Sequence, residues 1–151
     1  MGSIAVETLV SELAANQEEE RDILFGQRRA GPTLSTKDPV DADLRGRELK
    51  SVAAELSSGA RRGLTLMIWD KDGTLISLNT RGRAIYALAR KRPSYSNLIL
   101  ATPSPSQIDR LTATTDYDES LPARRITITP TRTSRVCLYG VSIDSGEITC
   151  P

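Results

Sequence analysis

The run Asp70-Lys71-Asp72-Gly73 is the feature that most restricts how this chain can fold. It lies between two apolar runs, residues 64–69 and 75–78, whose aliphatic side chains recur at alternate positions. An aspartate followed by a glycine between two such runs is typical of a β-hairpin, because glycine readily adopts the left-handed conformation that a tight reversal needs. The sequence therefore predicts two antiparallel strands near the middle of the chain.

The type of turn decides which residues of this hairpin lie opposite one another. We expect a type I turn with Gly73 in the left-handed position, which leaves a loop of about three residues. This loop pairs Trp69 with Leu75 and Ile68 with Ile76. Apolar side chains then meet apolar side chains across the hairpin, which favours this register.

Helices are predicted on both sides of the hairpin. Residues 4–25 carry an apolar stripe at helical spacing, formed by Val6, Leu9, Val10 and Leu13. Residues 26–43 contain two Pro-containing turns and are predicted to be a connecting loop. A second helix is expected over residues 43–58, with Gly59 as its end. A third is expected over residues 81–92, between the N-cap Thr80 and Pro93.

The remainder of the chain is predicted to contain mainly β-strands. Residues 97–102 should form a short buried strand, followed by a short helix over residues 104–111. Residues 123–150 should form an antiparallel β-meander, with its first reversal in residues 130–134. The first two strands of this meander are expected to face each other through Ile126, Ile128, Val136 and Leu138.

Length and composition indicate one α+β domain over residues 1–151. A chain of 151 residues with 38% hydrophobic and 26% charged residues is typical of a globular protein with a single core. The expected arrangement is two N-terminal helices, a central β-hairpin, a basic helix and a C-terminal antiparallel β-meander. Apolar runs fall short of the roughly 18–20 residues that span a bilayer, and the N-terminus lacks a secretory signal. We therefore expect no membrane span and an intracellular location, cytoplasmic or nuclear.

The two cysteines, Cys137 and Cys150, both lie near the C-terminus. If the chain reverses at residues 144–147, Cys150 lies opposite Gly140 or Val141, and Cys137 lies beyond the paired region. A disulfide requires the two Cα atoms to lie within about 7 Å of each other. We therefore expect free thiols.

The hairpin residues also resemble a catalytic motif. Residues 66–75 are similar to the first motif of the haloacid-dehalogenase-like phosphatases, in which a hydrophobic strand ends in Asp-x-Asp-Gly-Thr. The resemblance implies Asp70 as the nucleophile, Asp72 as the general acid/base and Mg²⁺ as the cofactor. Residues 98–102 resemble the second motif of that family, which implies that Thr102 binds phosphate.

Departures from the family pattern favour the turn over the catalytic motif. No lysine follows Lys91, although the family uses a lysine, or occasionally an arginine, after its second motif. Of the acidic residues at strand ends, only Asp144 could help to complete the Mg²⁺ site. The chain also has no histidine, which excludes Ser-His-Asp and Cys-His catalysis. We therefore expect no catalytic residue, metal or cofactor, with the phosphatase as the alternative hypothesis.

The predicted third helix is rich in cations. Arg83, Tyr86 and Arg90 recur at i, i+3 and i+7, so they should share one face. Arginine supplies sixteen of the twenty basic residues of the chain, and its guanidinium suits bidentate binding of phosphate or carboxylate. The alternative is a solvated helix face closed by favourable C-terminal cations. The candidate anion-binding residues are Arg81, Arg83, Tyr86, Arg90, Lys91, Arg92 and Tyr95.

These observations predict a non-enzymatic binding or assembly protein. Its partner would be RNA or an acidic protein surface, bound through the Arg/Tyr helix face. The N-terminal helix would mediate self-association, which predicts a homo-oligomer. Small size, absence of histidine and the arginine bias suit a viral accessory or structural protein.

Overall fold

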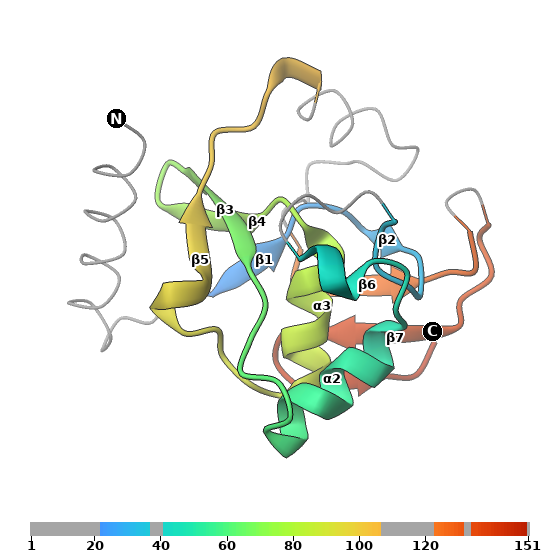
Figure 1. The fold of residues 1–151 in the computed structure, drawn as a ribbon. Helices are drawn as coiled ribbons and strands as arrows, with labels where there is room; N and C mark the ends of the chain where they lie inside the picture. Colours follow the sequence, from blue (N-terminus) through green and yellow to red (C-terminus); the bar gives the residue numbers. More distant parts are fainter. Residues whose placement is uncertain (1–21, 37–40, 107–122, 132–133, 151) are drawn as a thin grey trace.

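The computed structural model describes residues 22–36, 41–106, 123–131 and 134–150 of the chain (Figure 1). These residues form two helices and two four-stranded sheets, which confirms the predicted α+β class. No helix among them is both long and apolar enough to cross a membrane.

The first sheet contains the predicted hairpin. Its strand order is β1-β4-β3-β5, and β3 and β4 form the antiparallel central pair. The outer strands β1 and β5 each run parallel to their neighbour. The strands are β1 (Ile23–Phe25), β3 (Leu66–Lys71), β4 (Thr74–Ser77) and β5 (Leu98–Leu100).

The second sheet contains the predicted C-terminal meander. Its strand order is β2-β6-β7-β8, in which β6, β7 and β8 are antiparallel and β2 runs parallel to β6. The meander is therefore confirmed. The strands are β2 (Arg29–Ala30), β6 (Arg125–Ile128), β7 (Tyr139–Ser142) and β8 (Gly146–Ile148).

Helix α2 (Leu49–Ser58) corresponds to the predicted second helix. It ends as expected at Gly59, whose φ of 83° is left-handed. It begins later than predicted, because the residues before it form the short 3-10 helix η2 (Ala42–Leu44) and then an extended segment. The predicted loop over 26–43 is likewise not entirely irregular, since it contains β2 and part of η2.

Helix α3 (Thr80–Ala89) lies at the centre of the fold, with α2 beside it (Figure 1). It also contacts β1 of the first sheet and β7 and β8 of the second, so eight of its ten residues are buried. The helix ends before Pro93, because Arg90 turns left-handed and its N–H and that of Lys91 bond to carbonyls of the last turn. Asn79, not Thr80, occupies the N-cap position.

The hairpin is present, but its predicted register is wrong by one residue. Trp69 lies opposite Ile76 and Ile68 lies opposite Ser77. Asp72 and Gly73 both have positive φ, 53° and 90°, which makes a two-residue type I′ loop in place of the expected three-residue loop. A shift of one residue moves Ile76 to the other face of the sheet.

The predicted N-terminal helix is wrong at its end. Residues 23–25 form β1, whose burial alternates as Ile23 and Phe25 point into the core. A short apolar run cannot be assigned to helix or strand by periodicity alone, and here pairing with β4 decides for the strand. The rest of that helix, with its apolar stripe, lies outside the described residues, as do residues 107–111 of the predicted short helix.

The register of the first two meander strands also differs from the prediction. Ile126 pairs with Val141 and Ile128 pairs with Tyr139. Val136 and Leu138 were expected to be these partners, but they precede β7 and are 63% and 48% exposed. The connection between β6 and β7 is therefore longer than the tight reversal that was assumed. The predicted strand at 97–102 is confirmed as β5, although its Ile99 is exposed.

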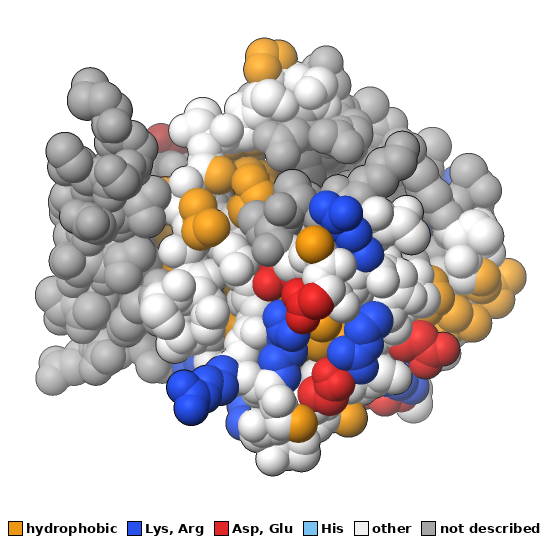
Figure 2. Space-filling model, viewed as in Figure 1, with side chains coloured by type: hydrophobic (Ala, Val, Ile, Leu, Met, Phe, Trp, Pro, Cys, Tyr) orange, Lys and Arg blue, Asp and Glu red, His pale blue; other side chains and the backbone are white. Residues whose placement is uncertain are grey.

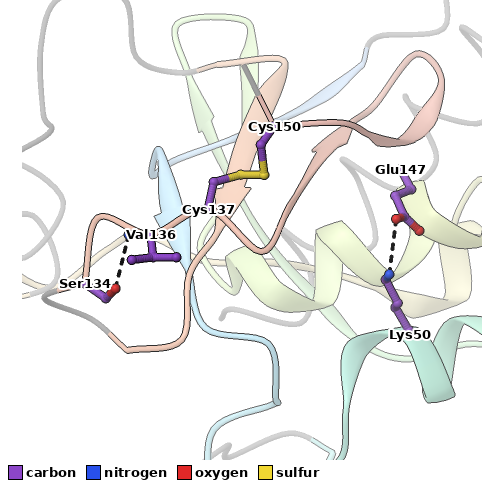
Figure 3. The surroundings of a disulfide bond; sticks show 6 residues. All are labelled: Lys50, Ser134, Val136, Cys137, Glu147 and Cys150. Carbon is purple, nitrogen blue, oxygen red and sulfur yellow. Dashed lines mark hydrogen bonds and ion pairs between the residues drawn. A yellow bond between two sulfur atoms is a disulfide. The ribbon is translucent and has the colours of Figure 1, made fainter.

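The prediction of free thiols is wrong, because Cys137 and Cys150 form a disulfide (Figure 3). Their Cα atoms are 5.9 Å apart. The observed register pairs Gly140 with Ile148, so that two residues further on Cys150 reaches the level of Leu138, next to Cys137. The prediction placed the turn at residues 144–147, which puts Cys150 opposite Gly140 or Val141 and therefore too far along the strand from Cys137.

Candidate functional site

The predicted Arg83–Tyr86 face does not face solvent. Arg83 is 7% exposed and Tyr86 is 1% exposed. The expected surface position is wrong because α3 is packed between α2, β1 and the meander, so helical spacing brings the two side chains together inside the fold. Tyr86 is thereby unavailable for stacking on a base.

The other predicted basic residues divide into two groups. Arg81 is half-buried, and its Nη1 donates to the carbonyl of Thr33 at 2.7 Å. Arg90, Lys91 and Arg92 are exposed at the C-terminal end of α3. Tyr95 begins the short 3-10 helix η3 (Tyr95–Asn97), and its side chain lies outside the described part of the structure.

The C-terminal end of α3 packs against β8 of the second sheet. The Arg90 stem lies close to Gly146 of β8, since a Cβ built on Gly146 would be 3.3 Å from Arg90 Cγ. The charges of Arg92 and Arg124 both act on Arg83, and that of Arg125 acts on Asp144. We call this part of the fold the basic end; it comprises the buried Arg83 and the exposed Arg90, Lys91, Arg92, Arg124 and Arg125.

Arg124 organises the basic end through two carboxylates. Its Nη1 donates to Asp22 at 2.9 Å, while Nε donates to Asp144 Oδ2 at 3.0 Å and Nη2 donates to Asp144 Oδ1. These bonds connect the start of β1, the start of β6 and the β7–β8 turn. The hydrogen bond from Arg124 holds the pKa of Asp144 below its ordinary value, and the bonds to Asp144 and Asp22 raise the pKa of Arg124.

The charges on the face that carries α2 are paired. Figure 2 shows basic and acidic side chains next to one another on that face. Arg47 forms a bidentate pair with Glu55 at 2.6 and 2.8 Å. Arg61 bonds to Asp43 at 2.8 Å and lies 3.5 Å from Asp41. At the basic end, Asp22 and Asp144 bind Arg124, and their charges also act on Arg83.

The residues of the phosphatase-like motif lie at the hairpin. Asp70 Oδ1 accepts a hydrogen bond from the N–H of Gly73 at 2.9 Å, which closes the turn, and Asp72 is one of its two central residues. Thr102 is exposed and follows β5, whose parallel pairing with β3 brings the ends of both strands to the same edge. Among the described residues, no three His, Cys, Asp or Glu side chains gather where they could hold a metal ion.

Arg124 and Arg125 were missed by the sequence reasoning. They lie more than thirty residues after α3, and the pairing of β6 with β7, which packs on α3, brings them to this side of the helix. The adjacent pair of arginines at the start of a predicted strand was the available signal. It could not indicate a shared surface without the register of the meander.

No protein-family model, curated protein sequence or solved structure matches the chain.

Proposed function

We propose that the protein is a non-enzymatic binding protein that contacts the phosphate backbone of RNA through the basic end. One observation carries this proposal. Arginines of α3 and of the start of β6 come together here, where Asp22 and Asp144 bind Arg124 and act on Arg83, whereas Arg47 and Arg61 on the α2 face are each paired with carboxylates. A surface with excess positive charge attracts polyanions over distances of about a Debye length.

Phosphate is favoured over an acidic protein surface by the kind of cation present. Five of the six residues of the basic end are arginines, whose planar guanidinium binds phosphate through two parallel hydrogen bonds. The burial of Tyr86 removes the stacking platform that the sequence suggested. The proposed contact is therefore to the backbone, with little dependence on base sequence.

Binding of single-stranded RNA of mixed sequence across a salt series tests this proposal. The logarithm of the association constant should fall linearly with the logarithm of the salt concentration. The double variant Lys91→Ala/Arg125→Ala should weaken binding about tenfold or more and reduce this slope, since each phosphate contact contributes about 0.7 to the slope for a single strand. Both residues are exposed, so the fold should be unchanged.

A matched control is the double variant Lys71→Ala/Arg135→Ala, which removes two exposed cations outside the basic end. Lys71 ends β3 at the hairpin, which Figure 1 draws at the top of the fold, while the C-terminal end of α3 is at the bottom. Equal loss of RNA affinity in the two double variants would reject the basic end as the binding surface. An acidic protein domain offered as a competitor distinguishes the second class of partner.

A Mg²⁺-dependent phosphatase is a second candidate, supported by the parallel pairing of β3 and β5. This pairing brings Asp70 and Thr102 to the same edge of the sheet. Asp70→Asn separates chemistry from structure, because the amide oxygen can still accept the Gly73 hydrogen bond while the nucleophilic carboxylate is lost. The measurement is hydrolysis of a generic phosphate ester. If no hydrolysis depends on both Mg²⁺ and Asp70, the phosphatase hypothesis is rejected.

Self-association is a further part of the proposed function. It rests on the apolar stripe predicted near the N-terminus, and a truncation can test it by light scattering. The truncation must stop before Asp22, because that residue binds Arg124 and β1 follows directly. The truncated protein lacks the first 20 residues, which include most of the predicted helix. If both the full chain and the truncated protein are monomers, the assembly role is rejected.

A further inference from the structure

Arg83 is a buried cation whose hydrogen-bonding capacity is mostly unused within the described residues. Its Nε donates to the carbonyl of Ile23 at 2.6 Å. A guanidinium carries five N–H groups, so four remain on the two terminal nitrogens. In the part of the chain that the structure describes, no hydrogen bond or ion pair engages these terminal nitrogens. Buried charges are normally paired, because their removal from water is costly.

Arg83 is not completely sealed inside the protein. The residue is 7% exposed, so a small part of it keeps contact with solvent.

The two nearby carboxylates are already committed to Arg124. Asp22 and Asp144 bind that guanidinium from two sides, and they act on Arg83 only through space. Burial is the main cause that lowers the pKa of Arg83 to about 10; the charges of Arg92 and Arg124 act in the same direction and those of Asp22 and Asp144 oppose it, so the side chain remains charged at neutral pH. The charges of two further guanidinium groups, those of Arg92 and Arg124, thus act on Arg83.

We propose that the terminal nitrogens of Arg83 bind one phosphate group, with Arg92 and Arg124 at the rim of the site. This inference rests on the proposed function and deepens it, because it assigns one phosphate of the bound ligand to a defined side chain. Arg124 keeps one N–H on each terminal nitrogen beyond its bonds to Asp22 and Asp144. The phosphate comes from an RNA backbone or from a small phosphorylated molecule.

Binding of inorganic phosphate, measured by calorimetry on the full chain, tests the site. Wild-type protein should bind phosphate saturably, and phosphate should raise its thermal midpoint. Arg83→Met keeps an unbranched chain of similar length and should weaken phosphate binding about tenfold or more, the loss expected for charge-assisted hydrogen bonds. Lys71→Ala should leave it unchanged. Phosphate binding that survives Arg83→Met, or no saturable binding by wild type, overturns the inference.

A second variant keeps the test decisive if Arg83→Met fails to fold. Arg83→Lys retains the charge but not the planar fork, so it should fold and still lose most phosphate affinity. An unchanged affinity in Arg83→Lys would reject bidentate binding by the guanidinium.

Parallel titrations with RNA separate this inference from the proposed function. RNA binding that depends on Lys91 and Arg125 but not on Arg83 would overturn the phosphate site and leave the basic end intact. Phosphate binding that depends on Arg83, without RNA binding, would reject RNA and identify a small phosphorylated ligand as the source. Loss of both phosphate and RNA binding in Arg83→Met, with Lys71→Ala unaffected, supports the RNA backbone.

Discussion

The phenol of Tyr86 takes the place of a backbone partner for Leu64. Its hydroxyl donates to the Leu64 carbonyl at 2.8 Å and accepts from the Leu64 N–H at 2.9 Å. Leu64 lies just before β3, where the chain has not yet entered the sheet, so its backbone groups need a partner from elsewhere. A Cβ on Gly63 would lie closest to Asn97 Nδ2 and only 2.8 Å from the same hydroxyl, so a residue without a side chain fits there.

Tyr86→Phe should lower the free energy of unfolding by about 2 kcal/mol or more. The ring still fills the core, but the buried N–H and carbonyl of Leu64 lose their shared partner, and each such loss costs about 1–3 kcal/mol. Urea denaturation measures the change. RNA affinity of the folded variant should equal that of wild type, because Tyr86 is inside the protein. A weaker RNA affinity at full folding would restore the surface role that the sequence suggested.

Gly73→Ala should destabilise the hairpin by about 1–2 kcal/mol. At φ of 90°, a residue with a Cβ pays a conformational penalty of this size, and no atom lies near enough to the added methyl group to compensate or clash. Asp72→Asn is the matched control at φ of 53°, since asparagine tolerates the left-handed region, and it should change the stability by less than about 0.5 kcal/mol. Equal effects of the two substitutions would contradict the type I′ assignment.

The hairpin also shows what local sequence can and cannot predict. Asp72-Gly73 and Gly59 specify a reversal and a helix end because the left-handed conformation is a property of the residues themselves. The register was wrong because both turn types accept Asp-Gly. The choice between them depends on β1 and β5, which pair with the two outer edges of the hairpin from distant parts of the chain.

Reduction of the Cys137–Cys150 disulfide should lower the free energy of unfolding by about 3 kcal/mol. The bridge closes a loop with a sequence separation of 13, and the lost chain entropy of the unfolded state gives this estimate. The loop contains β7 and β8, and Figure 3 shows that the Lys50–Glu147 ion pair, 3.1 Å long, connects this hairpin to α2. Thermal unfolding with and without reductant measures the change.

The double variant Cys137→Ser/Cys150→Ser is the control for this experiment. It should unfold like the reduced wild type and respond to reductant no further. Disulfides persist in oxidising compartments and are rare in the cytosol, so the pairing bears on the predicted intracellular location. Alkylation of the protein directly from its host cells, followed by mass spectrometry, tests that location: free thiols there would agree with it, and a disulfide would oppose it.

The candidate site was predicted only in part, because the exposure of its residues depends on how other elements pack on α3. The spacing of Arg83 and Tyr86 correctly indicates that they share a helix face. It does not tell whether solvent or another layer covers that face, because a helix enclosed by a second helix and two sheets has no solvated side at these positions. Arg90 to Arg92 remained exposed because the left-handed Arg90 takes the chain out of the packed region.

Tyr139 should make stability fall as the pH rises above about 10. Burial raises the pKa of its phenol to about 12, and the nearby carboxylates of Glu147 and Glu48 act in the same direction. The unfolded phenol ionises near its ordinary pKa of 10.0, so the neutral form is favoured in the folded state. The contribution to stability is therefore fully present below pH 10 and is lost as the pH rises towards 12.

Urea denaturation at about pH 9 and about pH 11 checks this expectation. The free energy of unfolding of wild type should fall over that interval by roughly 1 kcal/mol from this group, since each pKa unit corresponds to about 1.4 kcal/mol. Tyr86, whose pKa burial also raises, adds to the same fall. Tyr139→Phe keeps the ring against Lys50 Nζ, 4.2 Å from its centroid, and should show a smaller decrease. If the free energy of unfolding falls equally in Tyr139→Phe and wild type, the phenol of Tyr139 has the same pKa in the folded and unfolded chains.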